Sequence, residues 1–134
     1  MVALVRQKYL PEPPVDVLAG RAMMTPFILC ALISVISALV SLGFSVAAER
    51  TATGPARTMA LYACARSLAL FVASVVPFLS GSGGWLLAVA WSMIIVQALD
   101  AIVGMTIKDN VKTFGPAPTA LLNLAAVIWL IQST

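Results

Sequence analysis

The chain has 134 residues, of which 61% are hydrophobic and only 10% are charged, and its net charge is +3. A globular protein in water carries about 25% charged residues to cover its surface, so this composition excludes an ordinary soluble domain. A membrane-spanning helix needs about 20 apolar residues, and the length therefore allows one membrane domain of four helices and no soluble catalytic domain.

Residues 1–22 and 23–47 form the first two predicted segments. Pro11, Pro13 and Pro14 interrupt any continuous helix in the first segment, and we expect it to lie at the membrane interface. Residues 23–47 carry no charge and predict the first membrane-spanning helix. A cleaved signal peptide is the alternative, but its apolar core has only about 7 to 15 residues, which favours a retained helix.

Three more apolar segments follow, and they predict helices over residues 57–79, 85–107 and 116–132. The connections between them are too short to cross a membrane. Residues 23–134 are therefore predicted to form an all-α domain, a four-helix transmembrane bundle whose helices run antiparallel, up, down, up and down. The basic residues are divided almost equally between the two membrane sides, so the positive-inside rule gives no orientation.

The distribution of charge and the absence of histidine exclude several functions. The basic residues stand at the ends of the apolar segments, which is typical of contacts with lipid headgroups and argues against a nucleic-acid partner. The chain has no histidine and two cysteines. Zinc sites, His-ligated haem and His-based triads are therefore not expected, and we predict no metal and no cofactor.

Two charged residues lie well inside apolar segments, Arg66 in the second predicted helix and Asp100 in the third. An ionised group at such a depth costs about 2.5 to 3.5 kcal/mol or more. Counting 1.5 Å per residue from the helix ends places Arg66 about 13 Å and Asp100 about 10 Å below the same membrane surface. Antiparallel neighbours therefore bring the two to one level, and we expect a buried ion pair between them.

The same arithmetic predicts a polar layer around the ion pair. Gln97 is one turn from Asp100 on the same face of the helix, while Asn123, Ser37 and Ser41 lie at similar depths in the fourth and first helices. One interpretation is a structural pin that fixes the helix register through hydrogen bonds. The other is the floor of a cavity that binds a polar ligand group or relays a proton.

Cys30 and Cys64 lie near opposite membrane sides in this arrangement. Their depths differ by about 13 Å, whereas a disulfide requires Cα atoms within about 7 Å. We therefore expect both to be small packing residues.

Short motifs around these residues resemble a family of small four-helix membrane proteins, a domain of unknown function that is similar in layout to the DoxX-like group. The resemblance rests on ACARSLAL with Arg66, LDAIVGM with Asp100, and TALLNLAAV in the fourth helix. Family members often carry an acidic residue after the helix 2 Arg and a histidine near helix 4, whereas this chain has Ser67 and no histidine. The resemblance implies the four-helix fold over residues 20–132 and brings no activity with it.

Three functions remain open for a multi-pass integral protein, which we place in the cell membrane. The first is binding or transport of a small lipophilic or amphipathic molecule at the Arg66 and Asp100 layer. The second is a structural or assembly subunit of a larger membrane complex, and small-residue stripes also allow a homo-oligomer. The third and weakest is an enzyme with Asp100 as the acid, because a single paired carboxylate offers little chemistry. The lipid bilayer is the expected partner in each case.

Overall fold

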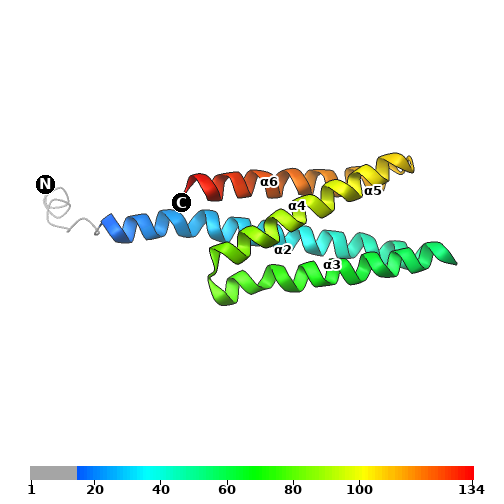
Figure 1. Cartoon of the computed structure of the whole chain (residues 1–134), viewed down its shortest axis with the longest axis horizontal. Coiled ribbons are helices and arrows are strands. Elements are labelled where there is room, and N and C mark those ends of the chain that lie inside the picture. Colours follow the sequence, from blue (N-terminus) through cyan, green and yellow to red (C-terminus); the bar gives the residue numbers. More distant parts are fainter. Residues whose placement is uncertain (1–14) are drawn as a thin grey trace, which may run out of the picture.

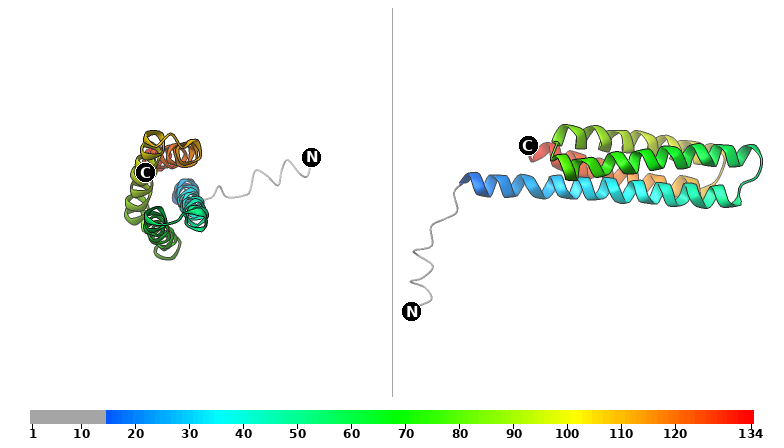
Figure 2. Two further views of the ribbon diagram at one scale, coloured as in Figure 1. Left: turned by 90° about the vertical axis from the view of Figure 1, so that its right-hand side faces the viewer. Right: turned by 90° about the horizontal axis from the view of Figure 1, so that it is seen from below.

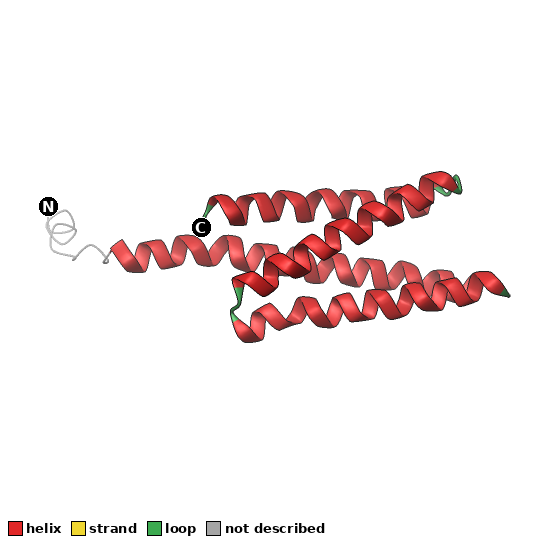
Figure 3. Cartoon of the chain, in the orientation of Figure 1, coloured by secondary structure: helices red, strands yellow, loops and turns green. Residues whose placement is uncertain are grey.

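The structure, a computed structural model, describes residues 15–134, except the side chains of residues 15–19 and Thr113. The described chain contains helices and no strand (Figure 3). The helices are α2 (Val15–Thr51), α3 (Pro55–Ser80), α4 (Gly83–Thr106), α5 (Asn110–Phe114) and α6 (Pro116–Gln132). Four stretches are long and apolar enough to cross a membrane: Gly20–Thr51, Pro55–Ser80, Gly83–Thr106 and Asn110–Gln132. The predicted all-α four-helix bundle is confirmed.

The helix bounds agree with the prediction for α3, α4 and α6 but differ for α2. The predicted first helix begins at residue 23, whereas α2 begins at Val15, directly after Pro14 in the sequence. A proline can precede or open a helix because the first turn needs no N–H from it. The remainder of the predicted interfacial segment, residues 1–14, lies outside the described residues. With 37 residues, α2 is about 56 Å long and extends beyond the other helices at one end (Figures 1 and 2).

Local signals in the sequence define the turn between α3 and α4. Gly81 adopts a left-handed conformation (φ 64°), and its N–H donates to the Pro77 carbonyl oxygen over 2.8 Å, which ends α3. Ser82 caps α4, since its hydroxyl accepts a hydrogen bond from the Trp85 N–H over 3.2 Å. The two caps explain how a connection of two residues reverses the chain.

A proline in α3 creates a contact with α4. Pro77 has no N–H, so the carbonyl of Ala73, four residues earlier, lacks its usual helical partner. The indole Nε1 of Trp85 donates to that carbonyl oxygen over 3.0 Å. Trp85 therefore fixes the start of α4 against α3 and supplies the hydrogen bond that the proline removes.

The four spanning helices form an antiparallel bundle in which α2 and α4 separate α3 from α6 (Figure 2). Figure 1 shows that α4 crosses the bundle obliquely: it starts beside α3 and ends, through α5, beside α6. We call the end of the bundle with the turn at residues 81–82 and the C-terminus at Thr134 the packed end. The opposite end, with the connections 52–54 and 107–115, is called the cavity end because a cavity lies there. Because of the tilt of α4, α3 and α4 diverge toward the cavity end.

Apolar side chains fill the packed end. The main buried cluster comes from α2, α4 and α6 and consists of Cys30, Ala31, Leu86, Ala90, Ala126, Val127 and Leu130. A second cluster, at the middle of the bundle, joins Ala38 of α2 to Val89 and Met93 of α4. Leu86, Met93 and Val127 have no exposed surface. Small residues on α2 let the larger side chains of α4 and α6 pack closely against its backbone.

Candidate functional site

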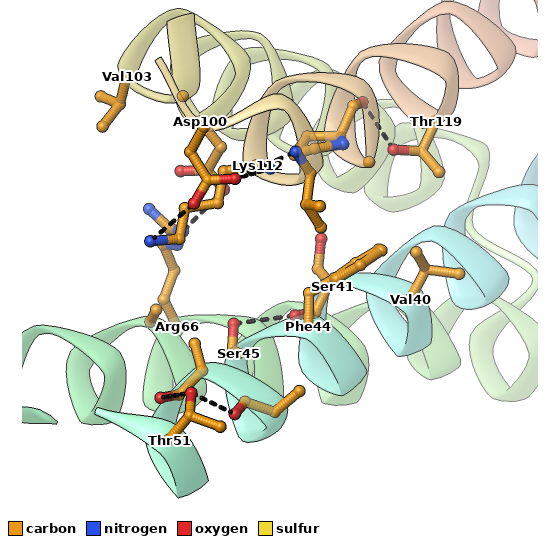
Figure 4. Close-up of a pocket in the computed structure, with 18 residues that line it drawn as sticks. Val40, Ser41, Phe44, Ser45, Thr51, Arg66, Asp100, Val103, Lys112 and Thr119 are labelled. Carbon is orange, nitrogen blue, oxygen red and sulfur yellow. Dashed lines mark hydrogen bonds and ion pairs between the residues drawn. The ribbon is translucent and has the colours of Figure 1, made fainter. Parts of the chain in front are cut away.

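The predicted ion pair between α3 and α4 is present. Arg66 Nη2 donates to Asp100 Oδ2 over 2.8 Å. Figure 4 shows the two side chains pointing toward each other from the two diverging helices. The prediction that Arg66 and Asp100 lie at the same depth in neighbouring antiparallel helices is therefore confirmed.

The expectation that the pair is buried is wrong. The side chain of Arg66 is 44% exposed and that of Asp100 is 28% exposed. The physical reason is the tilt of α4, because helices that diverge leave no third element to cover the contact between them. The pair instead forms part of the wall of a cavity.

The cavity has a volume of about 440 Å³ and lies between α2, α3, α4, α5 and α6 at the cavity end. Four charged side chains line it: Arg66, Asp100, Asp109 and Lys112. Apolar side chains from α2, α4 and α5 form much of the remaining wall, among them Val40, Phe44, Val103 and Val111. The site therefore combines two pairs of opposite charges with an apolar surface.

The second charged pair comes from the connection between α4 and α6. Lys112 Nζ lies 3.3 Å from Asp109 Oδ2. Asp109 also caps α5, since Oδ1 accepts hydrogen bonds from the N–H groups of Val111 and Lys112 over 3.1 and 3.2 Å. The hydrogen bond from the Lys112 N–H is the main cause of a lowered pKa of the Asp109 carboxyl. The sequence analysis missed this pair, although an Asp followed three residues later by Lys is a recognisable signal for a capped turn.

Asn123 and Ser37, two further predicted site residues, form a separate cluster. Asn123 Nδ2 donates to Ser37 Oγ over 2.7 Å and to the Thr119 carbonyl oxygen over 3.0 Å. Ser34 Oγ donates to Asn123 Oδ1 over 3.2 Å. All three side chains of this Asn123 cluster (Ser34, Ser37 and Asn123) are buried, and they join α2 to α6.

The single polar layer that the sequence predicted is thus divided in two. Ser45 Oγ of α2 lies 3.3 Å from the Oγ of Ser67, the residue after Arg66, so Ser45 marks the level of the ion pair. Ser37 lies eight residues, or about two turns, before Ser45 on α2. The Asn123 cluster is therefore about 12 Å deeper in the bundle than the ion pair. The depth of Asn123 was counted from the start of the fourth predicted helix, but α5 adds another helical segment between that point and the end of the bundle. Ser41, also predicted, lines the cavity.

Gln97, the remaining predicted residue, forms no side-chain hydrogen bond to the ion pair or to the Asn123 cluster. It is 1% exposed, and neither its Nε2 nor its Oε1 has a hydrogen-bond partner among the described residues. A buried amide without partners costs about 1 to 3 kcal/mol. The sequence predicted that Gln97 shares the helix face of Asp100, but Gln97 is buried and is not among the residues that line the cavity, whereas Asp100 lines it.

The cysteines and the acidic residues are the side chains from which a disulfide or a metal site would be built. Cys30 and Cys64 are both free thiols. The described part of the chain contains no group of three or more His, Cys, Asp or Glu side chains that could hold a metal ion.

Comparisons of the chain with protein families, with curated proteins and with solved structures give no match. The resemblance to the DoxX-like group therefore stays a prediction.

Proposed function

We propose that the chain is a multi-pass protein of the cell membrane that binds or transports a small lipophilic or amphipathic molecule in the cavity beside Arg66 and Asp100. The observation that carries the proposal is a cavity of about 440 Å³ with a partly exposed ion pair in its wall. Sites for small molecules are usually concave, about 300 to 1,000 Å³ in volume, and mostly apolar with a few placed polar groups.

The division of the polar residues supports ligand binding over a purely structural ion pair. A pin between helices is expected to be buried and fully hydrogen-bonded, and the Asn123 cluster fits that description. The Arg66 to Asp100 contact has one hydrogen bond and is partly exposed. The pair leaves hydrogen-bonding capacity unused, and its place in a membrane-spanning segment therefore favours a role toward a ligand.

Filling the cavity tests the proposal. Ala63 of α3 lines the cavity, and Ala69 lies six residues later on the same helix with an exposed side chain. We expect a total lipid extract to raise the midpoint of thermal unfolding in detergent for the wild type and for Ala69→Phe but not for Ala63→Phe. Ala48→Phe fills the cavity from α2 and should behave like Ala63→Phe. Agreement between the two variants would show that the loss of the lipid effect does not come from a local folding defect at residue 63.

An equal effect of the extract on all these variants would contradict binding in the cavity. In that case the structural alternative gains support, provided that the chain co-purifies in fixed ratio with another membrane protein or with further copies of itself. A lone, ligand-insensitive chain would contradict both functions.

A further inference from the structure

We infer that the ligand is an amphipathic anion, a molecule with a carboxylate or phosphate-ester head and an apolar tail, whose head binds between Arg66 and Lys112. The inference rests on the proposed function, because it assigns a chemical class to the molecule in the same cavity. It is argued from the hydrogen-bonding capacity that the charged groups of the cavity leave unused.

Arg66 has most of its donors available. A guanidinium carries five N–H donors, and within the described part of the chain Arg66 uses one of them, toward Asp100 Oδ2. The contact is thus made through a single nitrogen, although a carboxylate and a guanidinium can bond through two. The other nitrogen atoms can therefore bind an oxyanion without breaking the existing pair.

Lys112 is the second cation of the cavity, on α5. Its ammonium group has three N–H donors, and its contact with a described carboxylate is the one to Asp109 Oδ2 at 3.3 Å. Asp109, in contrast, is engaged by two backbone N–H groups and by Lys112. The Asp109 carboxylate is therefore already hydrogen-bonded as a helix cap, whereas the Lys112 ammonium group keeps N–H donors for a ligand.

The charged groups thus offer more donors than acceptors. Asp100 has one oxygen bound to Arg66, and the other accepts no hydrogen bond from the described residues. A cationic ligand would meet one unused oxygen at Asp100, whereas an anionic head would meet several unused donors from two different helices, α3 and α5. Hydrogen bonds from Arg and Lys to an oxyanion are charge-assisted and stronger than those between neutral groups.

The apolar side chains that line the cavity are the reason for assigning an apolar tail to the ligand. Val40 and Phe44 of α2 face the cavity opposite the helix that carries Val103. Val111 of α5 adds a further apolar side chain to this wall. A free inorganic anion would use none of this surface.

The test is binding of radiolabelled lauric acid to the detergent-solubilised full chain in a non-ionic maltoside, with unlabelled competitors. We expect dodecyl phosphate to compete as lauric acid does, and dodecanol, dodecyltrimethylammonium and inorganic phosphate to compete at least about tenfold more weakly. Equal competition by dodecanol or by the cation would overturn the assignment of an anion. Equal competition by inorganic phosphate would overturn the assignment of a tail.

Charge variants locate the head. Lys112→Gln should weaken lauric acid binding by about tenfold, and so should the double variant Arg66→Gln with Asp100→Asn, which leaves no charge unpaired. Lys108→Gln is the control, because it removes one positive charge from the same connection between α4 and α6. Lys108 is exposed and does not line the cavity, so this variant should bind lauric acid like the wild type. An equal loss in Lys108→Gln and Lys112→Gln would mean attraction by net charge and would contradict a head site at Lys112.

The two proposals fail in different ways. If Ala63→Phe abolishes the effect of the lipid extract but lauric acid does not bind, the cavity binds a molecule of another class, and only the inference of an anion is overturned. If Ala63→Phe leaves both the effect of the extract and lauric acid binding intact, the cavity is not the site, and both proposals are overturned.

Discussion

The two ends of the bundle are built from the same helices but pack in different ways. At the packed end α2, α4 and α6 surround a core that has no exposed surface at Leu86 and Val127. At the cavity end the same helices, with α3, surround about 440 Å³ of space and two ion pairs. The tilt of α4 makes the difference, because it moves α4 from α3 to α6 along the length of the bundle (Figure 1).

The comparison indicates that the close packing and the cavity lie toward opposite ends of the bundle. Helices in lipid associate through close packing and hydrogen bonds, and the packed end and the Asn123 cluster supply both. The cavity end can then carry incompletely bonded charges without loss of the fold. The following predictions test this separation, from the largest expected effect to the smallest.

Truncation of the core at the packed end should have the largest effect. Leu86→Ala should lower the free energy of unfolding by about 2 kcal/mol, since it leaves a cavity among rigid neighbours and the surrounding lipid removes part of the usual transfer cost. Leu99→Ala removes the same atoms from a side chain of α4 that is 56% exposed, and should change stability little. Detergent unfolding of both variants measures the difference. Equal losses would show that the packed end does not hold the fold.

Replacement of Gln97, at the boundary between the two halves, should stabilise the protein. Gln97→Leu keeps a similar volume and removes two buried polar atoms without partners, so we expect a gain of about 1 kcal/mol. Gln132→Leu makes the same change at an exposed position on α6 and serves as the control. The midpoint of thermal unfolding in detergent measures both. A loss of stability in Gln97→Leu would reveal a bound group at the amide and would extend the polar region beyond the cavity.

The ion pair of the cavity end should contribute little to folding. A double-mutant cycle with Arg66→Ala and Asp100→Ala should give a coupling energy of about 0.5 kcal/mol, the value for a partly exposed pair with one hydrogen bond. The measurement is detergent unfolding of the four proteins without added lipid. A coupling above about 2 kcal/mol would identify the pair as a structural pin and would erase the distinction between the ends.

The smallest effect concerns pH at Asp109. The pKa of its carboxyl is lowered from the ordinary value of 3.8, so the charge stabilises the fold above that value, and the stabilisation is lost as the pH falls through the lowered pKa. Asp109→Asn keeps a capping oxygen but no charge. The wild type should unfold at a slightly higher temperature than Asp109→Asn near neutral pH, and the difference should vanish in acid below pH 3.8. A difference in unfolding temperature that persists below pH 3.8 would mean that the charge of Asp109 does not cause it.

The sequence predicted the fold and the central ion pair because both follow from lengths and depths. Apolar runs of about 20 residues locate the spanning helices, and the rise per residue brings Arg66 level with Asp100. The depth of Asn123 was misjudged since five residues that looked like a loop, Asn110–Phe114, form α5. A Pro and Gly pair after them hid the continuity of the helical segment.

The cavity itself was only one of two interpretations of the sequence. Its walls depend on the angle at which α4 crosses the bundle, and an apolar periodicity defines a face of a helix but not its tilt. The place of Lys112 in the cavity wall was missed for a related reason: Lys112 lies on α5, a helix that the sequence did not predict. Directly after α5, Gly115 lies close to Phe44, where an added Cβ would stand 3.1 Å from the ring.

The length of α2 links the protein to the thickness of its membrane. Between Arg21 and Glu49 this helix has no charged residue, and that stretch is about 40 Å long, whereas the hydrocarbon core of a typical bilayer is about 30 Å thick. The mismatch is relieved by inclination of the helix or by lipids with longer acyl chains. Since α2 forms one wall of the cavity, its inclination and the shape of the cavity are mechanically connected. We therefore expect the acyl-chain length of the surrounding lipid to influence the shape of this cavity.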